Sequence, residues 1–323
     1  MSSWKEIITI LPAKKIILPQ NDPLKPYYNP SLARYRDKLL ISIRSSTWTL
    51  GEHGNGQEII GGKLHTDILL GEVDEKNLTV SNLVKLKYAG NVHEYIQNIG
   101  LEDVRLFVRN ATLYAMGVCM SKEDRQGESV HIAQGKITDN ELIFGELVPK
   151  PHPERIEKNW TVPEVANKFF DYIYSPTQIL KDNKLLGDHE YHGLLHGGSQ
   201  AIKWEDGWLS FQHKVHRAHM VDTRSFRQYC SYAVKYDKYG FATHISQGFL
   251  LFGDNHVEFI AGLVLNQGKF LVSLGIGDAQ SALALIDPAD LVFHEYKWNE
   301  EPIRAVLATN QILPAIRANS LDV

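Results

Sequence analysis

One stretch decides the fold: Glu258-Phe-Ile-Ala-Gly-Leu-Val-Leu-Asn-Gln-Gly-Lys-Phe-Leu-Val-Ser-Leu-Gly275. It places two β-rich apolar runs on either side of the short polar turn Asn266-Gln-Gly268. Strand-forming runs joined by Asn and Gly turn residues are typical of a β-hairpin. The stretch therefore predicts two antiparallel strands.

Four other stretches repeat this pattern of a polar or small start, a strand-like run, a polar turn and a second apolar run. They are residues 29–44, 102–117, 158–174, with its turn at Asn167, and 197–213. A hairpin repeated at long, irregular intervals is typical of a β-propeller, in which each blade is a small antiparallel sheet. We therefore predict an all-β, five-bladed β-propeller with short terminal extensions, formed by residues 1–323 as a single domain.

The overall composition permits a large core and excludes two classes of partner. The 323 residues are 43% hydrophobic and 22% charged, and the formal net charge is −4. An acidic chain has no general attraction to nucleic acid, so no nucleic acid partner is expected. The first residues lack a signal-peptide pattern and no apolar run approaches about 18 residues, so we expect a cytoplasmic protein without membrane insertion.

The starts of the five repeats are polar, although packing alone would favour apolar residues or glycine there. In a propeller the first strand of each blade lines the central axis, so these starts should converge. They carry Asn29, Glu102 with Asp103, Lys158 with Asn159, Ser199 with Gln200, and Glu258, while Arg44, His213 and Asp278 lie at the far ends of second strands. A ring of mixed charges around a funnel predicts a polar ligand site.

Two of these motifs allow both a functional and a structural interpretation. Strand alternation should send Asp103 and Arg105 to one face, where Asp103 is either a proton donor held by Arg105 or half of an ion pair that braces neighbouring blades. Trp160 either stacks on a sugar ring beside Lys158 and Asn159 or packs between blades, and we favour packing.

Other motifs give no metal or cofactor. Histidines cluster at His189, His192 and His196 and again from His213 to His219, but they lack partner cysteines or His-Glu-X-X-His spacing, so no metal is predicted. Gly275-Ile-Gly-Asp278 lacks the rest of a phosphate-loop motif. Its glycines indicate a sharp turn, and Asp278 either grips sugar hydroxyls in the funnel or caps the turn.

Taken together, the motifs resemble glycoside hydrolase family 130, the β-mannoside phosphorylases and hydrolases, and related five-bladed propellers. The matching pieces run from residue 29 to residue 284. They are Asn29-Pro-Ser31, Arg44 after an apolar strand, Glu102-Asp103-X-Arg105, Lys158-Asn-Trp160, Gly207-Trp-Leu209 leading to His213, and Gly-X-Gly-Asp278 before Ser281-Ala-Leu-Ala284.

The resemblance implies an inverting reaction at a sugar anomeric carbon with no covalent intermediate. It implies Asp103 as the acid, which in that family can act through a sugar hydroxyl rather than directly on the leaving oxygen, so the carboxylate spacing of ordinary inverting enzymes need not apply. Asp278 becomes a sugar-hydroxyl anchor, and Arg44, Lys158 and His213 become candidates for binding phosphate or another anion. The full set of substrate-binding candidates is Asn29, Arg44, Glu102, Arg105, Lys158, Asn159, Gln200, His213, Glu258 and Asp278.

The chain departs from the family pattern at three places. Val104 stands where the family usually has Pro, Lys214 follows His213 in place of Gly, and Ser199-Gln200 replaces a Pro-rich stretch. These departures suggest a divergent branch.

Three functions therefore stay open, each with a carbohydrate ligand and no tightly bound cofactor. The first is a β-mannoside phosphorylase or hydrolase, with inorganic phosphate as a co-substrate in the phosphorylase case. The second is a transferase that uses a nucleotide sugar. The third is a propeller that only binds carbohydrate, in which Arg105 would tie up Asp103.

Overall fold

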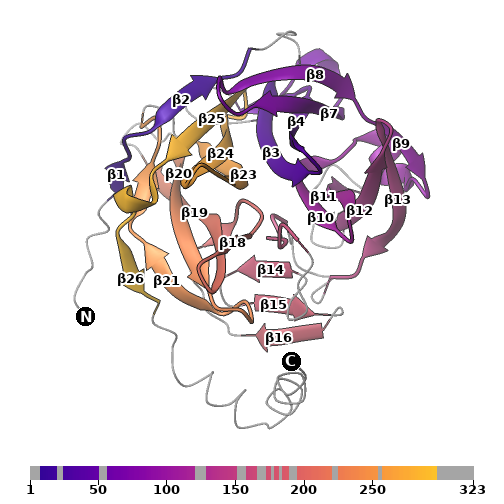
Figure 1. The fold of residues 1–323 in the computed structure, drawn as a ribbon. Coiled ribbons are helices and arrows are strands. Elements are labelled where there is room, and N and C mark those ends of the chain that lie inside the picture. Colours follow the sequence, from indigo (N-terminus) through magenta and orange to yellow (C-terminus); the bar gives the residue numbers. More distant parts are fainter. Residues whose placement is uncertain are drawn as a thin grey trace, which may run out of the picture.

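The computed structural model describes residues 8–19, 25–50, 57–120, 129–150, 158–165, 172–175, 178–181, 184–188, 195–219, 225–253 and 257–296. These residues lie almost entirely in strands and turns, which confirms the predicted all-β class. Helical structure among them includes α1 (Glu94–Asn98) and the 3-10 turns Ile60–Gly62 and Pro288–Asp290. Figure 1 shows that the larger sheets follow one another in chain order around a common centre.

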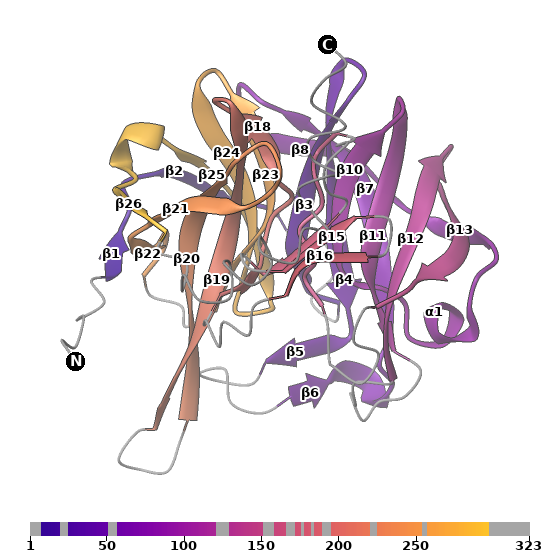
Figure 2. The same cartoon turned by 90° about the horizontal axis from the view of Figure 1, so that it is seen from below.

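The first two sheets each begin with a predicted hairpin. The first sheet runs in the order β3 (Tyr27–Tyr35), β4 (Lys38–Ser46), β7 (Thr66–Asp74) and β8 (Thr79–Lys85). The second runs β10 (Glu102–Arg109), β11 (Thr112–Met120), β12 (Val130–Thr138), β13 (Glu141–Val148) and β9 (Lys87–Gly90), with β9 parallel to β13. A small sheet of β5 (Trp48–Leu50) and β6 (Gln57–Ile59) lies to one side of them, as Figure 2 shows.

The third sheet differs from the hairpin predicted over residues 158–174. Its strands are β14 (Tyr172–Ser175), β15 (Gln178–Lys181) and β16 (Lys184–Asp188). Residues 158–165 make only isolated bridges, from Thr161 to Ile173 and from Pro163 to Ala201. Pro163 has no N–H for a regular ladder, which accounts for the irregular pairing. The predicted turn at Asn167 lies outside the described residues.

The last two sheets contain the remaining predicted hairpins. The fourth joins β17 (His196–Gly197), β18 (Ile202–Trp204), β19 (Gly207–His219), β20 (Ser225–Tyr236), β21 (Ala242–Ser246), β22 (Gly248–Leu250), β26 (Phe293–Glu295) and β1 (Ile8–Ile10). The fifth runs β2 (Lys14–Ile17), β25 (Gln280–Ile286), β24 (Lys269–Ile276) and β23 (Glu258–Asn266). Figure 2 shows the β19–β20 hairpin extending beyond the neighbouring strands.

The N-terminal strands tie the beginning of the chain to its end. β1 pairs in parallel with β22, and β2 pairs antiparallel with β25 as the outermost strand of the fifth sheet. The two sheets formed last along the chain are thus completed by its first described residues.

Apolar side chains pack between neighbouring sheets. Leu106 and Leu113 of the second sheet pack in one cluster with Leu40 of the first. Trp160 is only 1% exposed and belongs to another such cluster, which confirms its predicted packing role. Apolar side chains thus fill the space between the sheets, and the polar groups of the site lie at the inner ends of the strands.

Candidate functional site

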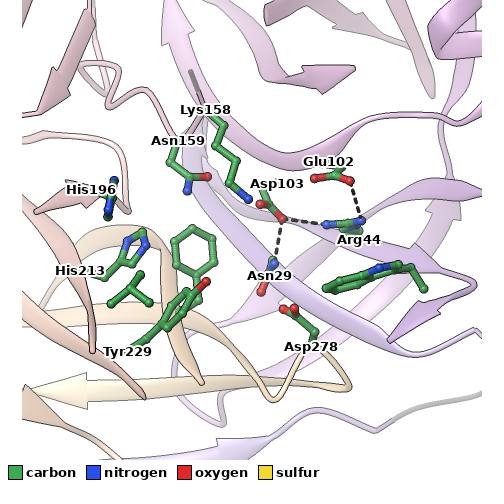
Figure 3. Close-up of a pocket in the computed structure, with 13 residues that line it drawn as sticks. Asn29, Arg44, Glu102, Asp103, Lys158, Asn159, His196, His213, Tyr229 and Asp278 are labelled. Carbon is green, nitrogen blue, oxygen red and sulfur yellow. Dashed lines mark hydrogen bonds and ion pairs between the residues drawn. The ribbon is translucent and has the colours of Figure 1, made fainter. Parts of the chain in front are cut away.

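A cavity of about 260 Å³ brings together residues from several sheets and from the segment 158–165. Figure 3 shows the side chains around it. The lining residues are Asn29, Arg44, Trp48, Glu102, Asp103, Lys158, Asn159, His196, His213, Val215, Tyr229, Phe259 and Asp278. Every predicted site residue except Arg105, Gln200 and Glu258 is among them.

A β-bulge lets two consecutive side chains share this wall. The pairing of β10 with β11 slips between Glu102 and Arg105, and Asp103 has a left-handed backbone with a φ of 49°. In a regular strand Glu102 and Asp103 would point to opposite faces. The bulge turns Asp103 so that both line the cavity, whereas Arg105 does not. The alternation expected for Asp103 and Arg105 is therefore broken by the bulge.

The same backbone device recurs in neighbouring segments. Asn29 has a φ of 48° where the pairing of β3 with β4 slips, and Asn159 has a φ of 62° in the segment 158–165. Asn and Asp tolerate this conformation better than other non-glycine residues. At Asn29, Asp103 and Asn159, which all line the cavity, the residue is therefore of a type that tolerates the left-handed backbone found there.

Asp103 is held as a carboxylate by two donors at one end of the cavity. Its Oδ1 accepts hydrogen bonds from Asn29 Nδ2 at 2.8 Å and from Arg44 Nη1 at 3.0 Å. Arg44 Nη2 also lies 3.5 Å from Glu102 Oε1, so one guanidinium faces two carboxylates. We call this group, together with Asp278, the acidic end of the cavity.

The surroundings of Asp103 set its charge. Burial raises the pKa of the Asp103 carboxyl, but Arg44, Lys158, Arg105 and the hydrogen bond from Asn29 outweigh burial and hold that pKa below its usual range. Asp103 is therefore ionised in the ligand-free protein. This state differs from the protonated acid that the resemblance implies.

Asp278 lies at the same end of the cavity, but its pKa is shifted in the opposite direction from that of Asp103. It follows β24 in a turn where Gly277 and Asp278 both have left-handed backbones, with φ of 58° and 48°. This turn aims the half-buried carboxyl into the cavity (Figure 3). Burial, and then the negative charge of Asp103, raise the pKa of Asp278 to about 6. Two carboxyls at one end of the cavity thus have pKa values pushed apart.

The other end of the cavity is built from rings. The His213 ring stacks on Tyr229 at 4.9 Å between centroids, meets Phe259 edge to face at 5.0 Å, and lies 5.4 Å from the His196 ring. We call His196, His213, Val215, Tyr229 and Phe259 the aromatic end.

His213 is neutral there. Burial first, then His196, Lys158 and Arg105, lower the pKa of His213 well below its usual range. His213 therefore offers a ring and a hydrogen bond to a ligand rather than the positive charge expected for anion binding.

Lys158 lies between the two ends. Its charge lowers the pKa of Asp103 and Asp278 on one side and of His196 and His213 on the other. Figure 3 shows its chain reaching toward Asp103. Among the described residues none forms an ion pair with Lys158, so its ammonium group remains available to a ligand within that part of the chain.

Arg105 lies behind the wall as a brace. Its Nε donates to the Gly198 carbonyl, its Nη1 to the Asp103 carbonyl, and its Nη2 to Asn159 Oδ1 at 3.3 Å. Its guanidinium also lies 5.0 Å from the centroid of Phe259. Burial lowers the pKa of Arg105 to about 10, which leaves it charged at neutral pH. The predicted ligand contact is thus replaced by contacts that position the two lining segments.

Gln200 and Glu258 also have protein partners in place of the expected ligand. Gln200 Nε2 donates to the carbonyls of Leu32 and Leu263, and its Oε1 accepts from the Leu263 N–H at 3.2 Å. Glu258 accepts three backbone hydrogen bonds from residues 251–253, at 2.6 to 3.0 Å. Because these atoms satisfy each other, the two side chains hold strands and a loop in place.

Five lining residues were not predicted: Trp48, His196, Val215, Tyr229 and Phe259. Val215 follows His213 by two residues on the same strand, so alternation from His213 indicates it. Phe259 directly follows the predicted residue Glu258. Tyr229 faces Val215 across β19 and β20, and only the strand register reveals that pairing.

Within the described residues, no group of three or more His, Cys, Asp or Glu side chains is placed to hold a metal ion. His189 and His192, which were considered as ligands, lie outside those residues. In the described part of the chain, no helix has the length and apolar character needed to cross a membrane.

Comparison with known proteins gives matches in structure alone. The sequence matches no family model and no curated protein sequence. A β-1,2-mannobiose phosphorylase from Listeria innocua, solved with β-1,2-mannobiose, is 13% identical with a TM-score of 0.58, and the match covers 86% of this chain and 98% of that one.

Two proteins from Leishmania mexicana are similar to the same degree. A mannose phosphorylase in complex with phosphate is 14% identical, with a TM-score of 0.55 and coverage of 88% of this chain and 92% of that one. A GDP-Man-dependent mannosyltransferase is 16% identical, with a TM-score of 0.54 and coverage of 88% and 91%. The chain therefore has the fold of the family 130 mannoside phosphorylases and hydrolases and related mannosyltransferases.

Proposed function

We propose that the protein is a carbohydrate-active enzyme that cleaves or transfers a mannoside-like glycosyl unit, with inversion, at the acidic end of the cavity. The fold shared with mannoside phosphorylases and a mannosyltransferase supports this proposal. We also propose that the sheets around the common centre are the blades of one closed five-bladed propeller spanning the chain, with the cavity at its axis.

One observation carries the functional proposal: Asp103 and Asp278 face one cavity with their pKa values moved in opposite directions. Glycosyl chemistry needs one carboxyl that gives a proton and another that stays charged, and opposite environments are how proteins obtain such a pair. Arg44 and Asn29 keep the charged member oriented. The ring of Trp48, also on the wall, offers a flat apolar face of the kind that sugar rings contact.

The nature of the second substrate follows from the cations. Of the three predicted anion-binding residues, Arg44 already faces two carboxylates and His213 is neutral. Lys158 is the described lining residue with a charge still available. This arrangement favours water, or phosphate bound chiefly through Lys158, as the partner of the glycosyl unit.

A transferase that uses a nucleotide sugar is the second candidate. Similarity to a GDP-Man-dependent mannosyltransferase supports it, as do the stacked rings of His213 and Tyr229, which suit a flat base. A cavity of about 260 Å³ is small for such a donor, which would extend beyond it.

The third alternative, a propeller that only binds sugar, is less well supported. In that alternative, Arg105 would form an ion pair with the Asp103 carboxylate and keep it from a ligand. Arg105 instead donates to the Asp103 backbone carbonyl, and the carboxylate faces the cavity.

A thermal-shift experiment tests the proposal with mannose, β-1,2-mannobiose, mannose 1-phosphate, GDP-mannose and inorganic phosphate. A ligand at about 100 times its Kd should stabilise the wild type by about 2.7 kcal/mol. Asp103→Asn should lose most of the shift produced by the mannosides. Asp139→Asn is the matched control, because Asp139 has the same left-handed backbone but lies exposed in the β12–β13 turn.

The pattern of shifts separates the candidates. A larger shift with GDP-mannose than with mannosides supports the transferase. No shift with any sugar, or equal shifts in wild type and Asp103→Asn, would contradict a sugar site at the acidic end.

A further inference from the structure

We infer that Tyr28 is a positioning residue for two groups on the cavity wall: its hydroxyl fixes Trp48, and its ring supports Arg44. Tyr28 itself is fully buried and is not one of the lining residues. The position of Trp48 is a property of the protein alone. Its consequence for sugar binding rests on the proposed function.

Tyr28 occupies the ladder position directly opposite Arg44. The register of β3 and β4 pairs these two residues, and the irregular stretch that contains Asn29 begins immediately after Tyr28. Side chains at opposed positions of antiparallel strands share one face of the sheet and interact. Two consecutive residues of β3 therefore support the same carboxylate, since Asn29 donates to Asp103 directly and Tyr28 contacts Arg44, its other donor.

The ring of Tyr28 supports the Arg44 guanidinium. The guanidinium carbon lies 4.8 Å from the centroid of this ring, while Nη1 donates to Asp103 Oδ1 at 3.0 Å. Figure 3 shows Arg44 between the carboxylates of Asp103 and Glu102. A cation over an aromatic face is attracted to it, more strongly where both groups are out of water, and Arg44 is only 3% exposed. The ring thus stabilises the orientation in which Arg44 reaches Asp103.

The hydroxyl of Tyr28 fixes the main chain at Trp48. It donates to the Trp48 carbonyl at 3.1 Å, where the chain leaves β4 and enters β5. The Trp48 N–H donates to Ser46 Oγ at 3.2 Å, so both main-chain polar groups of Trp48 are held. A buried hydroxyl costs free energy unless it is hydrogen-bonded, and Phe would fill the same space without that cost. The hydroxyl therefore serves the position of Trp48.

Trp48 transmits this constraint to the cavity. Its ring lies on the wall, and the centroids of the Trp48 and Tyr28 rings are 6.4 Å apart. A side chain that contacts a ligand is precise only when packing and hydrogen bonds behind it restrict its movement. The hydroxyl of Tyr28 thus acts on sugar binding through Trp48, and the ring of Tyr28 acts on Asp103 through Arg44.

Fluorine NMR of the full chain labelled with 5-fluorotryptophan tests the position of Trp48 without any sugar. The chain has six tryptophans, and Trp48→Leu assigns the Trp48 resonance by its loss. In Tyr28→Phe we expect this resonance to shift or broaden and to respond more strongly to replacement of H₂O by D₂O, which reports exposure of the ring. The Trp160 resonance, from the same apolar cluster, should not change.

Tyr35→Phe is the matched control, because Tyr35 lies at the other end of β3, is partly buried and does not line the cavity. It should leave the Trp48 resonance unchanged. A Trp48 resonance with unchanged position, width and solvent response in Tyr28→Phe would overturn the role of the hydroxyl.

Kinetics on β-1,2-mannobiose separate the hydroxyl from the ring. Tyr28→Phe should raise KM by roughly 3- to 10-fold, the range expected for one hydrogen bond. Its kcat should stay within about twofold of wild type, because the ring still supports Arg44. Tyr28→Leu also removes the ring, so Asp103 loses its orientation and kcat should fall by roughly 10- to 100-fold. Tyr35→Phe should match wild type in both constants.

A double variant tests the route through Trp48. In a Trp48→Leu background, Tyr28→Phe should raise KM no further, because the ring through which the hydroxyl acts is gone. A further increase in KM would contradict that route. A kcat of Tyr28→Phe that falls by tenfold or more would overturn the division between hydroxyl and ring, even if Tyr28→Leu does not fold. If the Trp48 resonance responds as predicted but no glycoside is turned over, the positioning of Trp48 stands and the proposed function fails.

Discussion

Asp103 combines an unusual backbone with an unusual charge environment. Its left-handed φ places it beside Glu102 on the cavity wall, and Arg44 and Asn29 then fix its carboxylate. A single bulge residue thus sets both the direction and the ionisation of one group. The motif Glu102-Asp103-X-Arg105 indicated the importance of this place in the sequence. The opposite states of Asp103 and Asp278 were not predictable, because they depend on neighbours from four separate segments.

The charge state of Asp278 predicts an effect on stability. Its pKa of about 6 in the folded protein lies above the unfolded value, so the folded state binds the proton more tightly. This contribution to stability is fully present below about pH 4 and is lost as pH rises to about 6. The Asp278→Asn variant does not titrate at this position and so avoids this loss. The difference in free energy of unfolding between variant and wild type should therefore favour the variant more at pH 8 than at pH 4, by on the order of 2–3 kcal/mol.

Urea unfolding of both proteins at the two pH values measures this difference. Asp139→Asn should show no such dependence, because Asp139 is exposed. An Asp278→Asn variant with equal relative stability at both pH values would contradict the raised pKa.

The inner strands are joined at the centre by two buried side chains. Gln200 connects β3 with β23 through Leu32 and Leu263, and Arg105 connects β10 with Gly198 and Asn159. Both were expected to bind substrate, since a polar residue near the axis has the same sequence signature whether its partner is a ligand or a strand. Only the packing of the strands shows whether the side chain binds a ligand or a neighbouring strand.

Gln200→Leu tests this structural role. The change leaves buried backbone groups of Leu32 and Leu263 without partners, and each unsatisfied group costs about 1–3 kcal/mol. We expect that loss in urea unfolding, with sugar affinity retained in the folded variant. The control Gln280→Leu lies at an exposed position of β25 and should change stability little. Loss of sugar binding at unchanged stability would instead return Gln200 to the ligand site.

Hairpins with a clear turn were the predictable elements. The turns around Asn110 and Gln267-Gly268 have left-handed residues where the Asn and Gly of the sequence predict turns. In the copy at 158–174, the described residues of the two predicted runs pair with each other only at the antiparallel bridge between Thr161 and Ile173, and Pro163 interrupts the first run. The pairing of β1 and β2 with the last two sheets was not predictable, since their short runs carry no sign of a partner hundreds of residues away.

At the scale of the whole molecule, the arrangement of sheets around one centre creates the site. Asn29, Asp103, Asn159, His213 and Asp278 are far apart in sequence and line one cavity because the first, second, fourth and fifth sheets and the segment 158–165 each direct residues toward it. The repeat therefore allowed eight residues of one cavity wall to be selected from the sequence, and their role in binding stays a prediction. Of the aromatic end only His213 was predicted, because Val215 and Tyr229 come from middle positions of β19 and β20 and Phe259 from β23, where apolar residues look like core.

The most direct test of the central claim follows the conversion of β-1,2-mannobiose by ¹H NMR, with and without inorganic phosphate. We predict that the α-anomer of the product forms first, as mannose or mannose 1-phosphate, and that Asp103→Asn is slower by roughly 10²- to 10⁴-fold while Asp139→Asn is unchanged. Initial formation of the β-anomer, or turnover by Asp103→Asn at the wild-type rate, would contradict an inverting glycosyl reaction at the acidic end of this cavity.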